Sequence, residues 1–185
     1  MRRIALLLAL SAGLFSASCF AQTNAPATPA APPATQAQEP VTCLPSRTLD
    51  ELVVALDDAI SGHADKDRAC MRQLLYSDAR LAPVIKSREG VFGLHSLSVD
   101  EWIDAVKKRG SGTFYEKQIK VASETYGHMA ELWTTYEIRG TADGKAVSRG
   151  VNSIQAVNDG RRWRITQILW QAETPAEPIP QKYLP

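Results

Sequence analysis

The chain has 185 residues, 44% of them hydrophobic, and a formal net charge of +1 from 21 Lys and Arg against 20 Asp and Glu. This length predicts one domain with a modest core. The nearly neutral charge argues against a nucleic-acid partner, which would need a concentrated basic face. No window approaches the roughly 20 consecutive apolar residues that span a bilayer, so we expect no transmembrane segment once the N-terminal signal is cleaved.

Residues 1–21 predict a signal peptide. A pair of arginines precedes a mostly apolar stretch, and Cys19 and Ala21 are the small residues that place cleavage after Ala21. The predicted localisation is therefore export, to the periplasm or outside the cell. Lipidation at Cys19 is the alternative, although the large aliphatic residue usual three positions before a lipidated cysteine is missing.

Residues 22–45 predict a disordered linker of polyproline II character, because this stretch is rich in Ala and Pro and has almost no large apolar residue to bury. Two cysteines remain after cleavage, Cys43 and Cys70. In an oxidising compartment an even pair favours a disulfide, and closing this loop would contribute about 3 to 4 kcal/mol. The alternative is one buried thiol and one free thiol in the linker.

Two helices are predicted next. Thr48 and Glu51 fit a capping box. Apolar residues then recur at helical spacing as far as Ile60, and Gly62 ends the helix. The pattern restarts over residues 66–75, which predict a second helix.

A short strand is predicted over residues 79–85, where Pro83 indicates a sheet edge or a bulge. Ser98 and Glu101 repeat the capping-box pattern and begin a third helix, which Gly110 closes.

Four strands follow, the first over residues 113–126 and three more within 128–173, which two Asp-Gly turns separate. Residues 46–173 are therefore predicted as one domain, and residues 174–185, with four prolines, as a tail on its surface. Helices segregated from an antiparallel sheet indicate an α+β fold.

Four stretches carry a family resemblance: DKDRACMRQLLYSDARLAPV, SVDEWIDAVKKRG, YGHMAELWTTYEIRG and SRGVNSIQAVNDGRRWRITQILWQAE. With this order of elements, residues 49–173 resemble the nuclear transport factor 2-like (NTF2-like) superfamily, which includes SnoaL-like cyclases and ketosteroid isomerases. The resemblance implies a cone-shaped, curved antiparallel sheet wrapped around the N-terminal helices, an apolar cavity and frequent dimerisation through the outer sheet face. It does not imply one activity, since the fold hosts isomerases, cyclases, dehydratases and binding modules.

Side chains of a strand alternate between two faces, and the sequence leaves open which face points toward the helices. Tryptophans could stack on a flat or hydrocarbon ligand, with packing in the core or at an interface as the alternative. An asparagine in mid-strand indicates a buried hydrogen-bonding role. The predicted pocket residues are Tyr115, Met129, Trp133, Asn152, Ile154 and Trp170.

Neither face of the last strand is purely polar. This pattern predicts a sheet covered on both sides, by helices within and by a second subunit outside. The alternative to a second subunit is a solvent-exposed outer face with scattered apolar residues.

The enzymes of this fold use a carboxylate or histidine inside the cavity, helped by a hydroxyl donor. Glu131 is the candidate catalytic base, because it lies in mid-strand between Met129 and Trp133 on its face. An outward carboxylate in a cross-strand ion pair is its alternative role. No metal site or cofactor is expected, since the three histidines have no ligand-like spacing and Cys43 and Cys70 are far apart.

Two functional hypotheses follow. The first is an exported domain that binds an unknown small apolar or amphipathic molecule in its cavity, that forms a homodimer, or both. The second is an isomerase-, cyclase- or dehydratase-like enzyme that uses a cavity carboxylate. The side of the sheet on which Glu131 lies discriminates between them.

Overall fold

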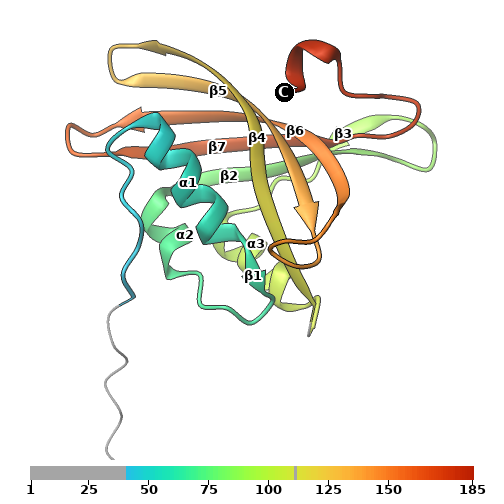
Figure 1. The fold of residues 1–185 in the computed structure, drawn as a ribbon, viewed down its shortest axis with the longest axis horizontal. Helices are drawn as coiled ribbons and strands as arrows, with labels where there is room; N and C mark the ends of the chain where they lie inside the picture. Colours follow the sequence, from blue (N-terminus) through green and yellow to red (C-terminus); the bar gives the residue numbers. More distant parts are fainter. Residues whose placement is uncertain (1–40, 111) are drawn as a thin grey trace, which may run out of the picture. The chain divides into compact units, whose positions relative to one another are not determined.

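The computed structural model describes residues 41–110 and 112–185. The predictions for residues 1–40, namely the signal peptide, its cleavage after Ala21, lipidation at Cys19 and most of the linker, lie outside the described residues. The described part contains three helices and a seven-stranded sheet of order β1-β4-β5-β6-β7-β2-β3 (Figure 1). The elements are α1 (Leu49–Ile60), β1 (Gly62–His63), α2 (Ala69–Leu74), β2 (Leu75–Lys86), β3 (Phe92–Leu94), α3 (Val99–Lys107), β4 (Thr113–Tyr126), β5 (Met129–Arg139), β6 (Ala146–Asn158), β7 (Trp163–Ala172) and the 3₁₀ turn η1 (Gln181–Tyr183).

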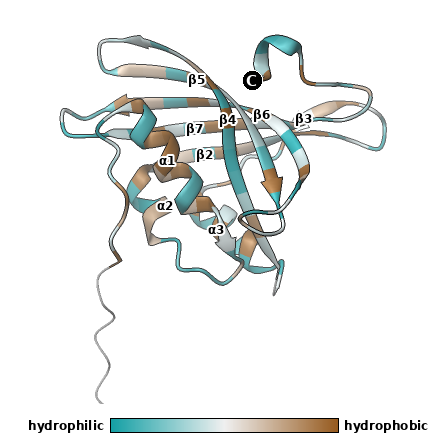
Figure 2. Cartoon of the chain, viewed as in Figure 1, coloured by the Kyte–Doolittle hydropathy of each residue, from teal (hydrophilic) through white to brown (hydrophobic). Residues whose placement is uncertain are grey.

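The predicted N-caps Thr48 and Ser98 are confirmed, but the capping box at Thr48 is incomplete, because the Glu51 carboxylate accepts a bond from the backbone N–H of Arg47 instead. The hydroxyl of Thr48 accepts a hydrogen bond from the backbone N–H of Glu51 at 3.1 Å. At the start of α3 the capping box is complete, because Ser98 and Glu101 each accept a bond from the other's backbone N–H. Figure 2 shows apolar and polar segments alternating around α1, as expected for a helix with one buried face.

The second helix is shorter than predicted, Ala69–Leu74 instead of 66–75. The reason is Arg68, whose buried guanidinium donates hydrogen bonds to backbone carbonyls of Ile60, His63, Ala64 and Lys66. These bonds hold the connection between α1 and α2 as a turn, so that the helix begins only after it.

The predicted antiparallel sheet needs a correction, since β2 pairs with β7 in parallel while β4 to β7 form an antiparallel run. α2 delivers the chain to the end of the sheet where β7 begins, and Leu75 of β2 lies beside Ile165. Pro83 lies at neither an edge nor a bulge, because it pairs with Trp170 of β7. On its other side the Pro83 carbonyl accepts a hydrogen bond from the backbone N–H of His95 at 3.3 Å, so that only the bond from the missing N–H is lost there.

The α+β class and the curved sheet on helices are confirmed. The sheet bends so that β4 reaches α1 (Figure 1), where Ser61 exchanges hydrogen bonds with the backbone of Glu116. Irregularities in the β4–β5, β5–β6 and β6–β7 pairings accompany the bend. The inner face and the helices share one core, whose least exposed members include Leu52, Leu56, Ile103, Val106, Leu132, Ile154 and Ile165.

A β-bulge explains why neither face of the last strand is purely polar. Gln155 pairs with Gln167 and Ala156 pairs with Ile165, which leaves Thr166 as the extra residue on β7. Ile165 and Ile168 therefore both join the core, although strict alternation would place them on opposite faces. The mixed pattern comes from this change of face and does not require a second subunit.

The two ends of the described chain are both attached to the domain. Cys43 and Cys70 form the predicted disulfide, which ties the segment before α1 to α2. The C-terminal tail, residues 174–185, lies on the outer face, where the ring of Tyr183 stacks on Trp133 with centroids 5.7 Å apart. Among the described residues, no helix is long and apolar enough to cross a membrane.

Candidate functional site

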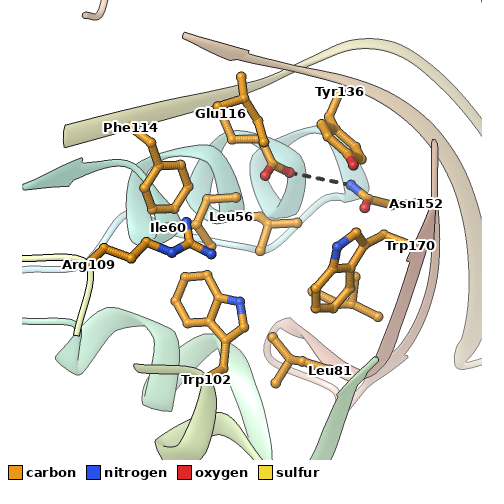
Figure 3. Close-up of a pocket in the computed structure, with 12 residues that line it drawn as sticks. Leu56, Ile60, Leu81, Trp102, Arg109, Phe114, Glu116, Tyr136, Asn152 and Trp170 are labelled. Atoms are coloured by element: carbon orange, nitrogen blue, oxygen red, sulfur yellow. Dashed lines mark hydrogen bonds between the residues drawn. The ribbon is translucent and has the colours of Figure 1, made fainter. Parts of the chain in front are cut away.

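The helices and the inner face of the sheet form a partly open cavity of about 90 Å³. Its walls are mostly apolar and come from α1, β2, α3 and the strands β4 to β7 (Figure 3). The lining residues are Leu56, Ile60, Leu81, Trp102, Arg109, Phe114, Glu116, Tyr136, Ile138, Asn152, Ile168 and Trp170.

One end of the cavity is polar, and the side chains of Glu116, Tyr136 and Asn152 point toward one another there (Figure 3). The Oε1 atom of Glu116 accepts hydrogen bonds from the amide groups of Gln118 at 3.0 Å and Asn152 at 3.5 Å. Its Oε2 atom and the Tyr136 hydroxyl have no hydrogen-bond partner within the described ranges. Both groups are therefore open to a ligand.

Gln118 connects this polar end to α1. Its backbone N–H and its side-chain amide both donate to the carboxylate of Asp57 at 3.2 Å. Its side-chain oxygen accepts bonds from Thr134 at 2.6 Å and from Asn152 at 3.1 Å. Because every member bonds at least one other, the network fixes the direction in which Glu116 and Asn152 point.

Burial raises the pKa of Glu116 to about 7, and the nearby charge of Asp57 acts in the same direction. Burial likewise raises the pKa of Asp57 to about 6, against the hydrogen bonds from Gln118. The pKa of Tyr136 is raised by burial and then by Glu116, so its hydroxyl stays protonated. Near neutral pH the polar end thus combines a carboxyl group that can gain or lose a proton with a neutral hydroxyl donor.

The cavity wall also carries a cation. Arg109 follows α3 and extends between Phe114 and Trp102 (Figure 3), with its guanidinium 5.4 Å from the centroid of the Phe114 ring. Arg68 lies on the same tryptophan, 5.9 Å from the ring centroid. The side chain of Arg109 forms no ion pair or hydrogen bond with any residue of 41–110 or 112–185.

The predicted site residues fall into three places. Asn152 and Trp170 line the cavity, and Ile154 is buried in the core beside it. The other pocket candidates, Tyr115, Met129 and Trp133, lie on the outer face: Met129 is 58% exposed and Trp133 is 42% exposed. Tyr115 lies between the inward Phe114 and Glu116 on β4 and so points away from the helices.

Glu131, the predicted catalytic base, also lies on the outer face. It is exposed and accepts a hydrogen bond from Ser153 at 3.3 Å. Its neighbours Ala130 and Leu132 are buried on the inner face of β5. Because successive side chains of a strand point to opposite faces, Glu131 lies on the outer face. The structure does not bring it near the cavity.

Sequence reasoning missed Glu116, Gln118, Asp57 and Arg109. The available signal for Glu116 was its position between Phe114 and Gln118, two residues away on each side along one face of β4. Asp57 follows the buried Leu56 on α1. A single charged residue next to a buried one is usual in an amphipathic helix and therefore gave no signal. Within the described ranges, no three residues of the types His, Cys, Asp and Glu lie close enough together to hold a metal ion.

A second hollow of about 280 Å³ lies on the outer face, beneath the C-terminal tail. Its walls include Trp133, Leu169, Ile179 and Tyr183. The tail itself forms one side of this groove. The shape of this groove therefore depends on how the tail packs, whereas no residue of the tail lines the inner cavity.

No protein-family model matches the sequence, and no curated protein matches it. Among solved structures, a protein of unknown function with a cystatin-like fold from Nostoc punctiforme is 9% identical over 69% of this chain and 90% of its own, with a TM-score of 0.53. The CaMKII hub of S. rosetta is 14% identical over 72% of this chain and 100% of its own, with a TM-score of 0.52. An NTF-2-like protein of unknown function from Silicibacter pomeroyi is 16% identical over 68% of this chain and 92% of its own, with a TM-score of 0.48.

Similarity at this level of identity shows the fold alone. The α+β fold predicted from the sequence, with a curved sheet on helices, is confirmed.

Proposed function

We propose that this chain is an exported NTF2-like domain that binds a small amphipathic molecule in its inner cavity. The observation that carries the proposal is the pairing of apolar walls with a fixed polar end, where Glu116 Oε2 and the Tyr136 hydroxyl have no partner among the described residues. A site with mostly apolar walls and a few convergent polar groups is typical of small-molecule binding.

The cavity volume limits the ligand. About 90 Å³ is well below the 300 Å³ or more typical of drug-sized ligands. A steroid or polyketide would need large movements of Trp102 or Trp170. A molecule of a few non-hydrogen atoms fits the site as it stands.

Export is supported by the disulfide between Cys43 and Cys70, because such bonds persist mainly in oxidising compartments. The N-terminal pattern of charge, apolar stretch and small residues supports it independently. Fractionation of the producing cells, with N-terminal sequencing of the purified protein, tests both the compartment and the cleavage after Ala21.

Native mass spectrometry of the protein purified from its own cell envelope tests ligand binding. We expect a co-purified molecule in the wild type and its loss in Leu56→Phe, which fills the cavity from α1. Val54→Phe adds the same ring two residues away on the same helix, at a position that is 58% exposed, and should keep the ligand. Retention of the molecule by a folded Leu56→Phe variant, or an unliganded mass for all three proteins, contradicts the proposal.

A second candidate function is proton transfer on a small carbonyl compound. It is favoured by Glu116, whose pKa of about 7 suits a general base or acid near neutral pH, and by the adjacent hydroxyl of Tyr136. The test is deuterium exchange at carbon next to the carbonyl, followed by NMR in D₂O with a panel of small ketones and aldehydes. Exchange should disappear in Glu116→Gln and persist in Glu131→Gln, and equal rates in both variants contradict this role.

The homodimer remains a proposal. The outer face exposes Met129 and part of Trp133, which are suitable apolar contacts for a second copy. One structural neighbour is itself named a hub, the CaMKII hub of S. rosetta. Light scattering behind gel filtration measures the mass in solution, and a monomer at high protein concentration contradicts the dimer.

A further inference from the structure

The cavity wall carries both a polar cluster and a cation, and this combination specifies a class of ligand. At one end the Glu116 carboxyl, the Tyr136 hydroxyl and the Asn152 amide converge (Figure 3). Beside Phe114, Arg109 provides a positive end. Apolar side chains form the walls between them.

The positive end has no negative partner in the described chain. Arg109 rests on the Phe114 ring, and no carboxylate of the described ranges pairs with it. Arg68 lies close enough that the charge of Arg109, after burial, lowers the pKa of Arg68. Arg68 bonds only backbone carbonyls, and the charge of Asp65, which raises its pKa, has a smaller effect than burial and Arg109.

Of the two guanidinium groups beside Trp102, Arg68 is buried and bonded to backbone carbonyls, whereas Arg109 is exposed, so an anion would contact Arg109. A guanidinium fork binds a carboxylate particularly well, because its N–H groups match the two oxygens. The far end of the cavity favours a neutral polar group, since Glu116 and Tyr136 offer a hydrogen-bond donor and acceptor.

We propose that the cavity binds a short-chain carboxylate whose anionic group contacts Arg109 and whose other end, when it bears a hydroxyl or carbonyl, contacts Glu116 and Tyr136. This inference rests on the proposed binding function and narrows it to one chemical class. The cavity volume of about 90 Å³ limits this ligand to a few non-hydrogen atoms.

The probes are propionate, its neutral isostere propionamide, and 3-hydroxypropionate, titrated into the purified wild-type protein and followed by NMR chemical shifts. We expect propionate to bind at least tenfold more tightly than propionamide, and 3-hydroxypropionate to bind more tightly than propionate. Arg109→Gln should weaken both acids at least tenfold and leave propionamide unchanged. Lys108→Gln, which removes an exposed charge from the neighbouring position, is the matched control and should behave as the wild type.

Three outcomes overturn the inference: propionamide binds as tightly as propionate, Arg109→Gln binds propionate as tightly as the wild type, or no probe binds at all. The native mass measurement separates these from failure of the binding function. If a neutral molecule co-purifies with the wild type and is lost in Leu56→Phe, the cavity is a binding site and only the proposed carboxylate specificity is wrong. If the wild type carries no ligand and no probe binds, both the binding function and the carboxylate specificity are wrong.

Discussion

Replacing Glu116 by Gln tests whether the cavity carboxyl titrates as its surroundings predict. Burial raises the pKa of Glu116 from its ordinary value of 4.5 to about 7, so the folded state holds this proton more tightly than the unfolded chain does. A shift of this size corresponds to ~3 kcal/mol. Because the folded-state pKa is the higher one, the free energy of unfolding is greatest below about pH 4.5 and falls until about pH 7.

Asp57 acts in the same direction, since burial raises its pKa from 3.8 to about 6. The two carboxyls are linked through Gln118, so we expect one continuous loss of stability rather than two separate steps. In the wild type, the free energy of unfolding should be lower at about pH 8 than at about pH 5 by ~3 kcal/mol or more.

Urea denaturation at the two pH values, with the disulfide intact, measures this difference. Glu116→Gln keeps an acceptor oxygen for Gln118 and Asn152 but cannot ionise, so most of the pH dependence should vanish and the variant should be the more stable protein at about pH 8. Glu131→Gln changes an exposed carboxyl and should keep the pH dependence of the wild type. Parallel pH curves for the wild type and Glu116→Gln would refute the reasoning.

Three further predictions concern stability. Replacing both cysteines of the disulfide by serine should lower the free energy of unfolding in urea by about 3 to 4 kcal/mol, and an unchanged value contradicts the role of the closed loop. In Gly150→Ala the new methyl carbon would lie 2.3 Å from the Tyr136 hydroxyl, so a loss of about 1 to 3 kcal/mol is expected, and a wild-type melting temperature speaks against this close contact. Ending the chain after Glu173 removes the tail from Trp133 and should lower the urea midpoint; equal midpoints would mean that the tail only rests on the surface.

The sequence predicts those parts of the fold that depend on local signals. Thr48 and Ser98 cap their helices because a hydroxyl followed three residues later by Glu satisfies backbone N–H groups locally. The direction of β2 depends on where α2 delivers the chain, which is a matter of packing between distant segments. Thr166 gives no local sign that it is the extra residue of a bulge, and one such residue reverses the face of every side chain after it.

The site could be predicted only where one residue type is unusual for its position. Asn152 was found because an amide is disfavoured among apolar residues in mid-strand, and it does line the cavity. Glu116 was missed because β4 carries charged or polar residues on both faces, with Lys117 outward and Glu116 inward. Glu131 was selected from the composition of one face of β5. Which face is buried depends instead on the helices that pack against the sheet, and they pack against the other face.

The polar network at the end of the cavity does not serve stability at neutral pH. Glu116 and Asp57 both have raised pKa values because burial penalises their charged forms, so ionising them destabilises the fold. A well-packed apolar residue at position 116 would remove this penalty, as it does for other buried charges. Gln118, Asn152 and Thr134 nonetheless hold the Glu116 carboxyl in one orientation with one oxygen unoccupied. A costly group that is held in place and left open at a cavity is the pattern expected of a binding or reacting group, and the higher stability expected of Glu116→Gln at alkaline pH should therefore come with loss of the ligand.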